Sequence, residues 1–301
     1  MIQPIVRSLR VHQWTKNLVL FAGPIFTLRI LDPAVALASI AGFLAFSLAA
    51  SGVYVLNDIV DAERDRLHPE KRLRPVASGS LPIPAAAVLA ALLLVAGLGG
   101  TAAIGSRFAT AALAYVVLTG AYSLVLKRVV LLDVVCIATG FVIRAIAGVE
   151  LVRDRTHLGP ETIQISPWLL VCAFFLALFL AIGKRLYELE TLERDAAKHR
   201  AALGAYTRPL LDQLIAVVTS ATVLAYSVYT ISPETIAKYH GRPLYLTIPF
   251  VLYGIFRYLY LLYAEHKGGN PSEHLLRDHA TLVNVMLWCG LVVAILLWPV
   301  A

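Results

Sequence analysis

Long apolar segments alternate with short polar ones along the whole chain. An α-helix of about 20 apolar residues crosses a bilayer core about 30 Å thick, and most of these segments reach that length. The pattern therefore predicts an all-α, polytopic membrane protein with about nine membrane-spanning helices in a single domain, 1–301. The predicted spans are 16–30, 34–57, 82–104, 107–126, 130–149, 166–186, 208–230, 243–264 and 280–299. The first span is short and contains Pro24, so we expect it to be kinked or tilted.

The composition supports a membrane protein. Hydrophobic residues make up 59% of the 301 residues and charged residues 15%, whereas a soluble domain has about 25% charged residues. The basic residues gather in loops that follow alternate spans, which predicts a cytoplasmic N-terminus and an external C-terminus. We expect a multi-pass protein of the cell membrane whose active site faces the cytoplasm. The net charge of +7 suits membrane lipids or anionic substrates, and nucleic acid is not an expected partner.

The N-terminal residues 1–15 have a different pattern. Apolar residues share one face of a predicted helix, and two arginines lie off that face. The apolar residues are Ile2, Ile5, Val6 and Leu9, and the arginines are Arg7 and Arg10. This pattern predicts a short helix that lies in the membrane interface before the first span.

The candidate chemistry begins where the second span ends. Asn57 and Asp58 close the span, and Asp61 and Asp65 follow at helical spacing, so the three carboxylates share one helix face. Like charges at this spacing repel by roughly 0.2–0.5 kcal/mol per pair, and a bound cation would offset that cost. Oxygen ligands suit Mg²⁺, which often takes its remaining ligands from substrate phosphates. We interpret these four residues as metal-binding and catalytic; the alternative is a solvated loop of mixed charge.

Basic residues follow the acidic segment at once. They are Arg64, Arg66, Lys71, Arg72 and Arg74. Carboxylates for Mg²⁺ next to cations for phosphate make a site suited to a diphosphate leaving group.

An arginine lies deep in the fifth span. Arg144 is about twelve residues into the apolar segment, near the middle of the bilayer, where a charge is costly. Asp133 lies eleven residues earlier, on nearly the same helix face, and Gly140 and Gly148 would permit close helix contact. Two interpretations remain open: a structural stripe that includes Asp133 and Arg144, or a phosphate-binding arginine in a polar cavity.

Other polar residues at span ends have two interpretations each. Lys127, Lys184 and Arg185 either set the topology or bind substrate. Glu188 either pairs with Lys184 one helical turn away or faces a metal. Because the ends of the second and sixth spans are both charged, we expect them to face each other across a central cavity open to the cytoplasm.

The chain resembles the UbiA-like intramembrane prenyltransferase superfamily. The resemblance rests on the Asn-Asp-x-x-Asp-x-x-x-Asp segment at Asn57–Asp65, which ends the second span, and on the nine predicted helices. It implies that this segment holds Mg²⁺ on a diphosphate and that the apolar bundle guides a polyprenyl chain.

A narrower resemblance is to the bacterial decaprenyl-phosphate phosphoribosyltransferases, one branch of that superfamily. The stretches that carry it are Gln13-Trp14 with Lys16-Asn17, the segment from Asn57 to Pro75, Leu126-Lys127, Arg144 to Gly148, and Gly183-Lys184-Arg185 with Glu188. The resemblance implies transfer of 5-phosphoribose from phosphoribosyl pyrophosphate to a polyprenyl phosphate, in the synthesis of cell-wall arabinan precursors. The candidate substrate-binding residues are Gln13, Lys16, Asn17, Arg66, Lys71, Arg72, Arg74, Tyr122, Lys127, Arg144, Lys184, Arg185, Tyr187 and Glu188.

One departure from the general superfamily favours this branch. Aromatic prenyltransferases usually carry a second Asp-x-x-x-Asp segment after the sixth span, and here that region is Lys184-Arg185-Leu186-Tyr187-Glu188. An aromatic prenyltransferase that uses a polyprenyl diphosphate is the main alternative, and a transporter or lipid flippase is a weaker one. Further copies of the chain are an additional candidate partner, in a homo-oligomer such as a trimer.

Overall fold

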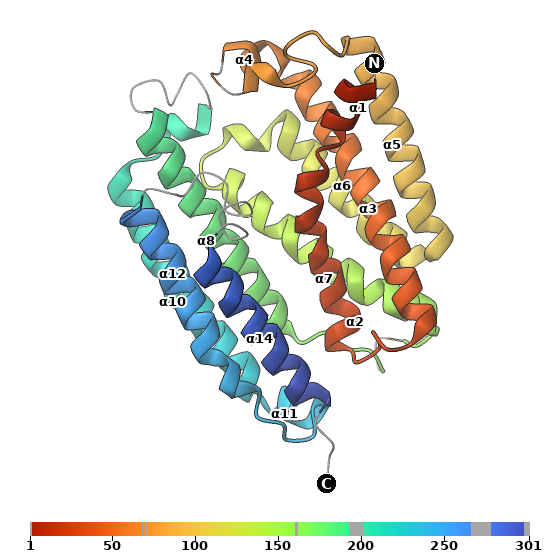
Figure 1. Ribbon diagram of the computed structural model, residues 1–301, viewed down its shortest axis with the longest axis vertical. Coiled ribbons are helices and arrows are strands. Elements are labelled where there is room, and N and C mark those ends of the chain that lie inside the picture. The colour runs from red at the N-terminus through yellow and green to blue at the C-terminus, as the bar shows by residue number, and fades with distance from the viewer. Residues whose placement is uncertain are drawn as a thin grey trace. The chain divides into compact units, whose positions relative to one another are not determined.

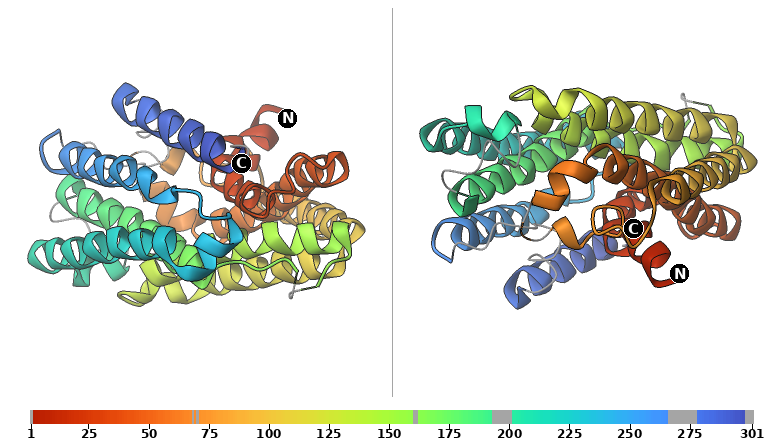
Figure 2. Two further views of the ribbon diagram at one scale, coloured as in Figure 1. Left: turned by 90° about the horizontal axis from the view of Figure 1, so that it is seen from below. Right: turned by 90° about the horizontal axis from the view of Figure 1, so that it is seen from above.

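The computed structural model describes residues 2–67, 69, 71–159, 162–192, 201–265 and 278–297. Every regular element in these ranges is a helix, as Figures 1 and 2 show. The chain forms two compact units. The N-terminal unit runs to Ile165 and includes Ala201 and Ala202, and the C-terminal unit comprises the other described residues from Ser166 on.

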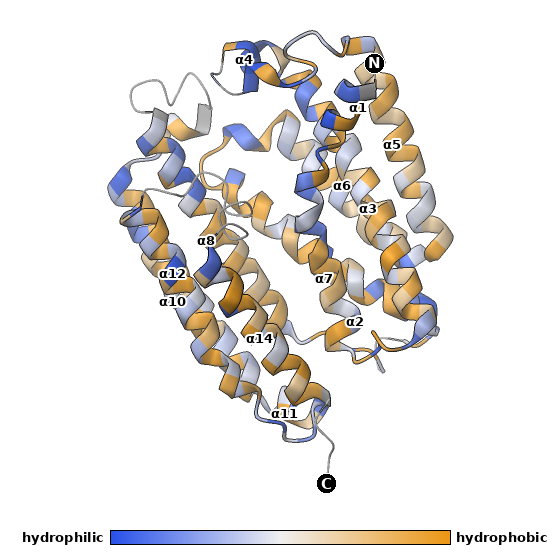
Figure 3. Cartoon of the chain, in the orientation of Figure 1, coloured by the Kyte–Doolittle hydropathy of each residue, from blue (hydrophilic) through white to orange (hydrophobic). Residues whose placement is uncertain are grey.

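The N-terminal unit contains the acidic segment and most of the candidate site. Its helices are α1 (Ile2–Leu9), η1 (Val11–Phe21), α2 (Ala22–Phe26), α3 (Pro33–Val60), α4 (Ala62–Leu67), η2 (Lys71–Leu73), α5 (Ile83–Ile104), α6 (Ser106–Leu124), η3 (Leu126–Arg128) and α7 (Leu132–Thr156). Helix α5 packs along α3, and α6 packs along α7. Figure 3 shows α5 hydrophobic along most of its length, whereas the short α4 is largely hydrophilic.

The first predicted span differs from the expectation. Residues Val11–Phe21 form a 3₁₀-helix, and α2 continues it. Eleven 3₁₀ residues at ~2.0 Å and five α residues at ~1.5 Å give about 30 Å, which is near the thickness of the hydrocarbon core. The tighter helix therefore covers the distance of a span with fewer residues, and its change of geometry begins well before Pro24.

Two hydrogen bonds to α3 explain how so long a 3₁₀-helix is held. Trp14 Nε1 donates to Ser51 Oγ at 3.0 Å, and Asn17 Nδ2 donates to Ser47 Oγ at 2.9 Å. Residues three apart eclipse in a 3₁₀-helix and are separated by ~6 Å, which equals the rise between residues four apart in an α-helix. The two antiparallel helices therefore stay in register over this pair of bonds.

Glycines let the same segment approach α7 closely. A Cβ added to Gly148 would collide with the backbone carbonyl oxygen of Leu20, and one added to Gly23 would collide with the backbone of Gly148. The expectation that Gly148 permits close helix contact is therefore confirmed. The contact sets Asn17 beside the middle of α7, where Arg144 lies.

The C-terminal unit is simpler. Its helices are α8 (Pro167–Leu192), η5 (Ala201–Ala205), α10 (Arg208–Ile231), α11 (Pro233–Lys238), η6 (Leu244–Thr247), α12 (Ile248–Tyr263) and α14 (His279–Leu297). Helix α8 packs along α10, and α12 packs against α14. Tyr226 on α10 ties these helices together, because its hydroxyl lies 2.6 Å from Thr247 Oγ1 and accepts a hydrogen bond from Trp288 Nε1 at 3.0 Å.

Eight helices in the described ranges are long and apolar enough to cross a membrane: Pro33–Val60, Ile83–Ile104, Ser106–Leu124, Leu132–Thr156, Pro167–Thr191, Arg208–Ile231, Leu244–Tyr263 and His279–Leu296. They correspond one to one to predicted spans two to nine. The all-α class is confirmed. The count of nine stays a prediction, because it depends on whether Val11–Phe26 also crosses the bilayer.

Candidate active site

The acidic segment lies at a break between two helices. Helix α3 ends at Val60, Asp61 takes a non-helical conformation with φ −94° and ψ 2°, and α4 begins at Ala62. The backbone nevertheless continues as a helical turn, since Asp61 N donates to Asn57 O and Asp65 N donates to Asp61 O. Carboxylates at the C-terminal end of α3 meet the negative end of its dipole, so the segment requires positive partners.

Arg74 lies between two of the carboxylates. Its Nη1 is 3.2 Å from Asp58 Oδ1 and 2.6 Å from Asp65 Oδ2. Asp58 is 2% exposed and the Asp65 side chain 7%, so these charges are held out of water and matched by a cation.

Lys127 neutralises the third carboxylate. Its Nζ lies 2.7 Å from both carboxylate oxygens of Asp61 and 3.1 Å from Asn57 Oδ1. Lys127 is in η3, between α6 and α7, so this ion pair ties the end of α3 to the α6–α7 turn. Asp58 and Asp65 thus share Arg74, whereas Asp61 pairs with Lys127.

Arg10 is a site residue that the sequence analysis placed only off the apolar face of the predicted N-terminal helix. It stands between α1 and η1 in the left-handed conformation, with φ 50° and ψ 50°, and its Nη2 donates to Asp58 Oδ1. The guanidinium also lies over the ring of Tyr54, 5.6 Å from its centroid. Burial lowers the pKa of Arg10, and Asp58 opposes that shift. The position of Arg10 follows from the 3₁₀ geometry of the next segment, which the sequence pattern does not indicate.

Both arginines use the same oxygen of Asp58. Oδ1 accepts from Arg10 and Arg74, while Oδ2 accepts no hydrogen bond from the residues that the structure describes. Asp65 is similar, since Oδ2 binds Arg74 and Oδ1 has no partner in the described ranges. No three His, Cys, Asp or Glu side chains in the described ranges gather as a ready metal site. Asp58 and Asp65 nevertheless fit a divalent cation, because both already flank one positive nitrogen and each keeps an oxygen available.

Arg144 forms a second cluster, on α7. It is 4% exposed, its Nε donates to Asn17 Oδ1 at 2.8 Å, and its Nη2 donates to Tyr115 Oη at 2.7 Å. The guanidinium lies over the rings of Tyr115 and Phe141, 4.5 and 5.0 Å from their centroids. Within the described part of the chain its partners are an amide, a phenol and aromatic faces. Asp133 is eleven residues and ~16 Å away along α7, so it is not a direct partner of Arg144, and both interpretations of Arg144 stay predictions.

Lys16 precedes Asn17 on η1. The positive charges of Arg144 and Arg10 both act on it, and it makes no hydrogen bond or ion pair with the described residues. Lys16 and Arg144 are therefore two cations near each other whose charge no described carboxylate balances. Such a pair has the charge to receive an anion.

The candidate residues of the C-terminal unit form their own cluster on α8. Arg185 is 1% exposed and its Nη1 donates to Glu188 Oε2 at 2.6 Å, whereas Lys184 Nζ is 3.9 Å from Glu188 Oε1. The predicted pairing of Glu188 with Lys184 is therefore present, and Arg185 makes the shorter contact with the same carboxylate. Tyr187 is half-buried beside them.

The remaining candidates lie in the N-terminal unit. Arg66 is exposed and its Nε donates to Ala77 O at 3.2 Å, and Arg72 is exposed on η2. Gln13, Lys71 and Tyr122 are half-buried. His68 of the acidic segment lies outside the described residues.

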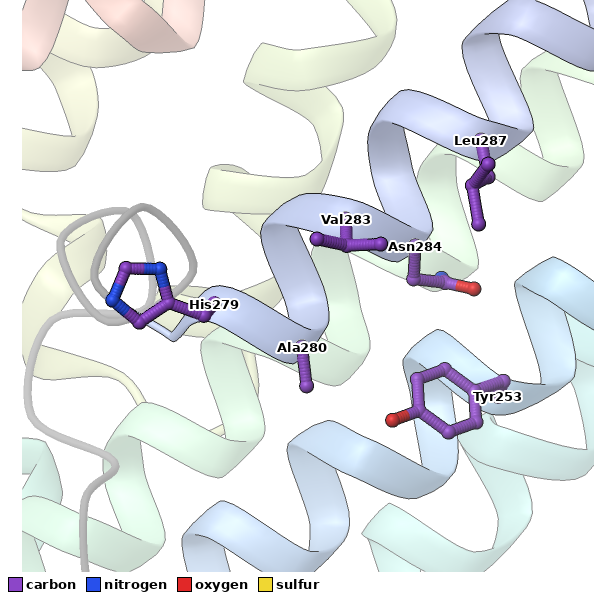
Figure 4. A pocket seen from close by; sticks show the side chains of 6 residues that line it. All are labelled: Tyr253, His279, Ala280, Val283, Asn284 and Leu287. Atoms are coloured by element: carbon purple, nitrogen blue, oxygen red, sulfur yellow. The ribbon is translucent and has the colours of Figure 1, made fainter.

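An apolar groove of about 510 Å³ lies between α12 and α14 (Figure 4). Tyr253, His279, Ala280, Val283, Asn284 and Leu287 line it. Asn284 donates its side-chain amide to Phe250 O, and the lining holds no carboxylate, lysine or arginine. The groove therefore lacks the carboxylates that suit Mg²⁺ and the lysines or arginines that would neutralise a phosphate.

Comparison with known proteins agrees with this chemistry. Residues 19–272 match the model of the UbiA prenyltransferase family. The chain belongs to the UbiA prenyltransferase family. The match runs through both compact units, and it makes the protein a membrane enzyme of the UbiA type.

Two relatives and one solved structure refine the picture. The decaprenyl-phosphate phosphoribosyltransferase of Mycolicibacterium smegmatis is 33% identical over 96% of this chain and 91% of its own length. The enzyme of that name from Corynebacterium glutamicum is 32% identical over 98% of this chain and 87% of its own length. A UbiA homologue from Archaeoglobus fulgidus, solved with GPP and Mg²⁺ bound, has a TM-score of 0.73 at 20% identity and covers 97% of this chain and 99% of that one. The last likeness establishes the fold alone.

Proposed function

We propose that this UbiA-family enzyme transfers 5-phosphoribose from phosphoribosyl pyrophosphate to a polyprenyl phosphate and releases pyrophosphate. The observation that carries the proposal is the end-to-end identity of about a third to relatives named decaprenyl-phosphate phosphoribosyltransferase. The site supports it, because it offers more phosphate-binding cations than a single prenyl diphosphate requires. A role in cell-wall arabinan precursor synthesis belongs to the same proposal.

The acidic cluster is suited to the leaving group. Asp58 and Asp65 would hold Mg²⁺ through their available oxygens, with Asn57 and Asp61 close by on the same turn. Bound Mg²⁺ would neutralise charge that develops on the departing pyrophosphate. Arg74 and Lys127 would bind pyrophosphate oxygens directly, because cations placed where charge develops stabilise the transition state.

The second cluster is suited to another phosphate. Arg144 on α7 bonds to Asn17 of η1, the residue next to Lys16, and no described carboxylate balances the charge of either cation. They would bind either the 5-phosphate of the donor or the phosphate of the lipid acceptor. The bond between ribose C1 and the pyrophosphate oxygen breaks, and a bond from C1 to an acceptor phosphate oxygen forms. That oxygen is already ionised near neutral pH, so no strong general base is required.

The orientation in the membrane is part of the proposal. The basic residues of α4, η2 and η3 favour a cytoplasmic position for the acidic cluster, with the N-terminus inside. Phosphoribosyl pyrophosphate, a soluble and highly charged donor, would then reach the site from the cytoplasm. The polyprenyl chain of the acceptor would remain among the apolar helices.

The test uses purified protein in detergent with radiolabelled phosphoribosyl pyrophosphate, decaprenyl phosphate and Mg²⁺. We expect lipid-linked phosphoribose and pyrophosphate in equal amounts, loss of both with EDTA, and recovery when Mg²⁺ is restored. Product from a polyprenyl diphosphate and an aromatic acid, with none from the phosphoribosyl donor, would instead establish an aromatic prenyltransferase.

A further inference from the structure

The acidic cluster is balanced in charge. Three carboxylates, Asp58, Asp61 and Asp65, face three cations, Arg10, Arg74 and Lys127, and each cation forms an ion pair with at least one of the carboxylates. A balanced cluster exerts little net attraction on a lone divalent cation, because the field of the arginines opposes that of the carboxylates. A ligand that brings both a divalent cation and phosphate oxygens satisfies both halves of the cluster.

The Arg10 guanidinium is placed to move from Asp58 to a phosphate oxygen of a bound ligand. Its bond is to Asp58 Oδ1 alone, which leaves most of the five guanidinium N–H donors available, and 17% of its side chain is exposed. Because Arg74 also binds Oδ1, Asp58 stays neutralised and oriented when Arg10 turns toward a phosphate.

The backbone of Arg10 is held on both sides. Ser51 Oγ donates to Leu9 O at 2.7 Å and accepts from Trp14 Nε1, so residues on either side of Arg10 are tied to one position on α3. A turn of the Arg10 side chain therefore moves a charge by a few ångströms without moving α1 or η1.

We propose that Arg10 is a positioning residue that couples divalent-cation binding to diphosphate binding at Asp58 and Asp65. The inference rests on the proposed function, since it assumes that this cluster binds a metal–diphosphate donor. Arg10 weakens binding of the cation alone, because its positive charge, held at Asp58, repels the cation. It strengthens binding of the diphosphate, because it then bonds to phosphate oxygens. Couplings of this kind commonly amount to about 5–150-fold in affinity.

The experiment measures divalent-cation binding and diphosphate binding separately on the full-length protein. Binding of Mn²⁺ alone is followed by electron paramagnetic resonance, and binding of radiolabelled pyrophosphate is followed by equilibrium dialysis at saturating Mg²⁺. For Arg10→Gln we expect Mn²⁺ affinity to rise about fivefold or more and pyrophosphate affinity to fall by a similar factor. Opposite signs are the signature, since a residue that only shapes the site would weaken both.

Three further variants serve as controls. Arg7→Gln removes the same charge from the exposed arginine one turn earlier on α1, and neither affinity should change. Ser51→Ala loosens the backbone tie without altering charge, so Mn²⁺ affinity should not rise. Arg10→Lys keeps the positive charge, so Mn²⁺ affinity should stay near that of the wild type. If Arg10→Gln fails to fold, a large change of Mn²⁺ affinity in Arg10→Lys would contradict the proposed charge effect.

The outcomes separate the two proposals. If Arg10→Gln changes neither affinity, or weakens both, the coupling role is refuted while the metal site stands. If the wild-type protein binds neither Mn²⁺ nor pyrophosphate, the acidic cluster is not the proposed site and both proposals fail.

Discussion

The two polar clusters of the N-terminal unit differ in how their charges are balanced. Around Asp58 each carboxylate has a cation within 3.2 Å, and each cation has a carboxylate. Around Arg144 the described partners are Asn17, Tyr115 and aromatic rings, and the neighbouring charge is a second cation, Lys16. One cluster is neutral as it stands, and the other carries net positive charge in a buried place.

This difference indicates what each cluster can receive. A neutral cluster of opposite charges favours a ligand that carries both signs, such as a metal bound to a diphosphate. A buried positive cluster favours a simple anion, since an uncompensated charge away from water is costly. A reaction that joins a diphosphate donor to a phosphorylated acceptor needs one site of each kind. The following predictions test whether the two clusters bind these two kinds of ligand.

The largest effect is expected for Asp58→Asn. This change removes a carboxylate charge from the diphosphate site, and stabilising contacts to a developing anionic transition state are worth roughly 2.7–4 kcal/mol each, so turnover should fall by about 10²–10³-fold. Phosphoribosyl transfer at saturating Mg²⁺ and donor is the measurement. The matched control is Glu63→Gln, an exposed acid on α4, which should keep normal turnover. Near-normal turnover of Asp58→Asn would show that the acidic cluster is not the metal site.

Arg144→Ala comes next in size. If Arg144 binds a substrate phosphate, affinity for donor or acceptor should fall at least tenfold, in line with about 1.5–3 kcal/mol for a hydrogen bond to a charged group. The melting temperature without substrate should stay close to that of the wild type, because the partners left behind are neutral. Breaking a buried ion pair would instead cost about 3–5 kcal/mol. A large loss of thermal stability with unchanged affinities would identify Arg144 as a structural residue.

Much of the fold could be predicted from the sequence because apolar length is a strong signal. Each of spans two to nine has its helix, and six of them agree with the prediction within three residues at both ends, since the apolar length needed to cross a bilayer is a clear signal. The helices Leu132–Thr156 and Pro167–Thr191 run seven and five residues beyond the predicted ends, because charged residues continue the helix past the apolar segment. The first span was harder. Its 3₁₀ geometry depends on hydrogen bonds from Trp14 and Asn17 to serines of another helix, and a single-segment pattern cannot indicate such a partner.

The site shows the same limit. The spacing of Asp58, Asp61 and Asp65 predicted a shared helix face, but the break at Asp61 turns that carboxylate to Lys127 while the other two share Arg74. The depth of Arg144 marked it correctly as a residue that needs a polar environment. Its partner Tyr115 lies in a different span, which hydropathy alone cannot pair with it.

A moderate effect on stability is expected for Gly148→Ala. The added methyl group would meet the Leu20 carbonyl oxygen, so η1 must shift away from α7, and overpacking of this kind costs roughly 1–3 kcal/mol. The melting temperature should fall, and substrate affinity should fall with it because Asn17 moves relative to Arg144. Gly99→Ala is the control, since a Cβ there meets nothing within 4 Å. Equal melting temperatures for the two variants would contradict the close contact between η1 and α7.

The smallest effect is expected for Ser47→Ala. This variant tests whether the hydrogen bond from η1 to α3 is needed for anion binding at Arg144. The change removes the hydroxyl that accepts from Asn17 Nδ2, and hydrogen bonds between membrane helices average about 0.6 kcal/mol. A shift of the melting temperature by a degree or two is therefore expected. Asn17 Oδ1 still accepts from Arg144 Nε, so the guanidinium stays in place and substrate affinity should change less than twofold.

Ser39→Ala, on the same helix, is the control, because its hydroxyl bonds only within α3, to Val35 O. If Ser47→Ala lowered affinity as strongly as Arg144→Ala, the hydrogen bond from Asn17 to Ser47 would be essential for placing Arg144. The positive cluster would then be a property of the η1–α3 register and not of α7 alone.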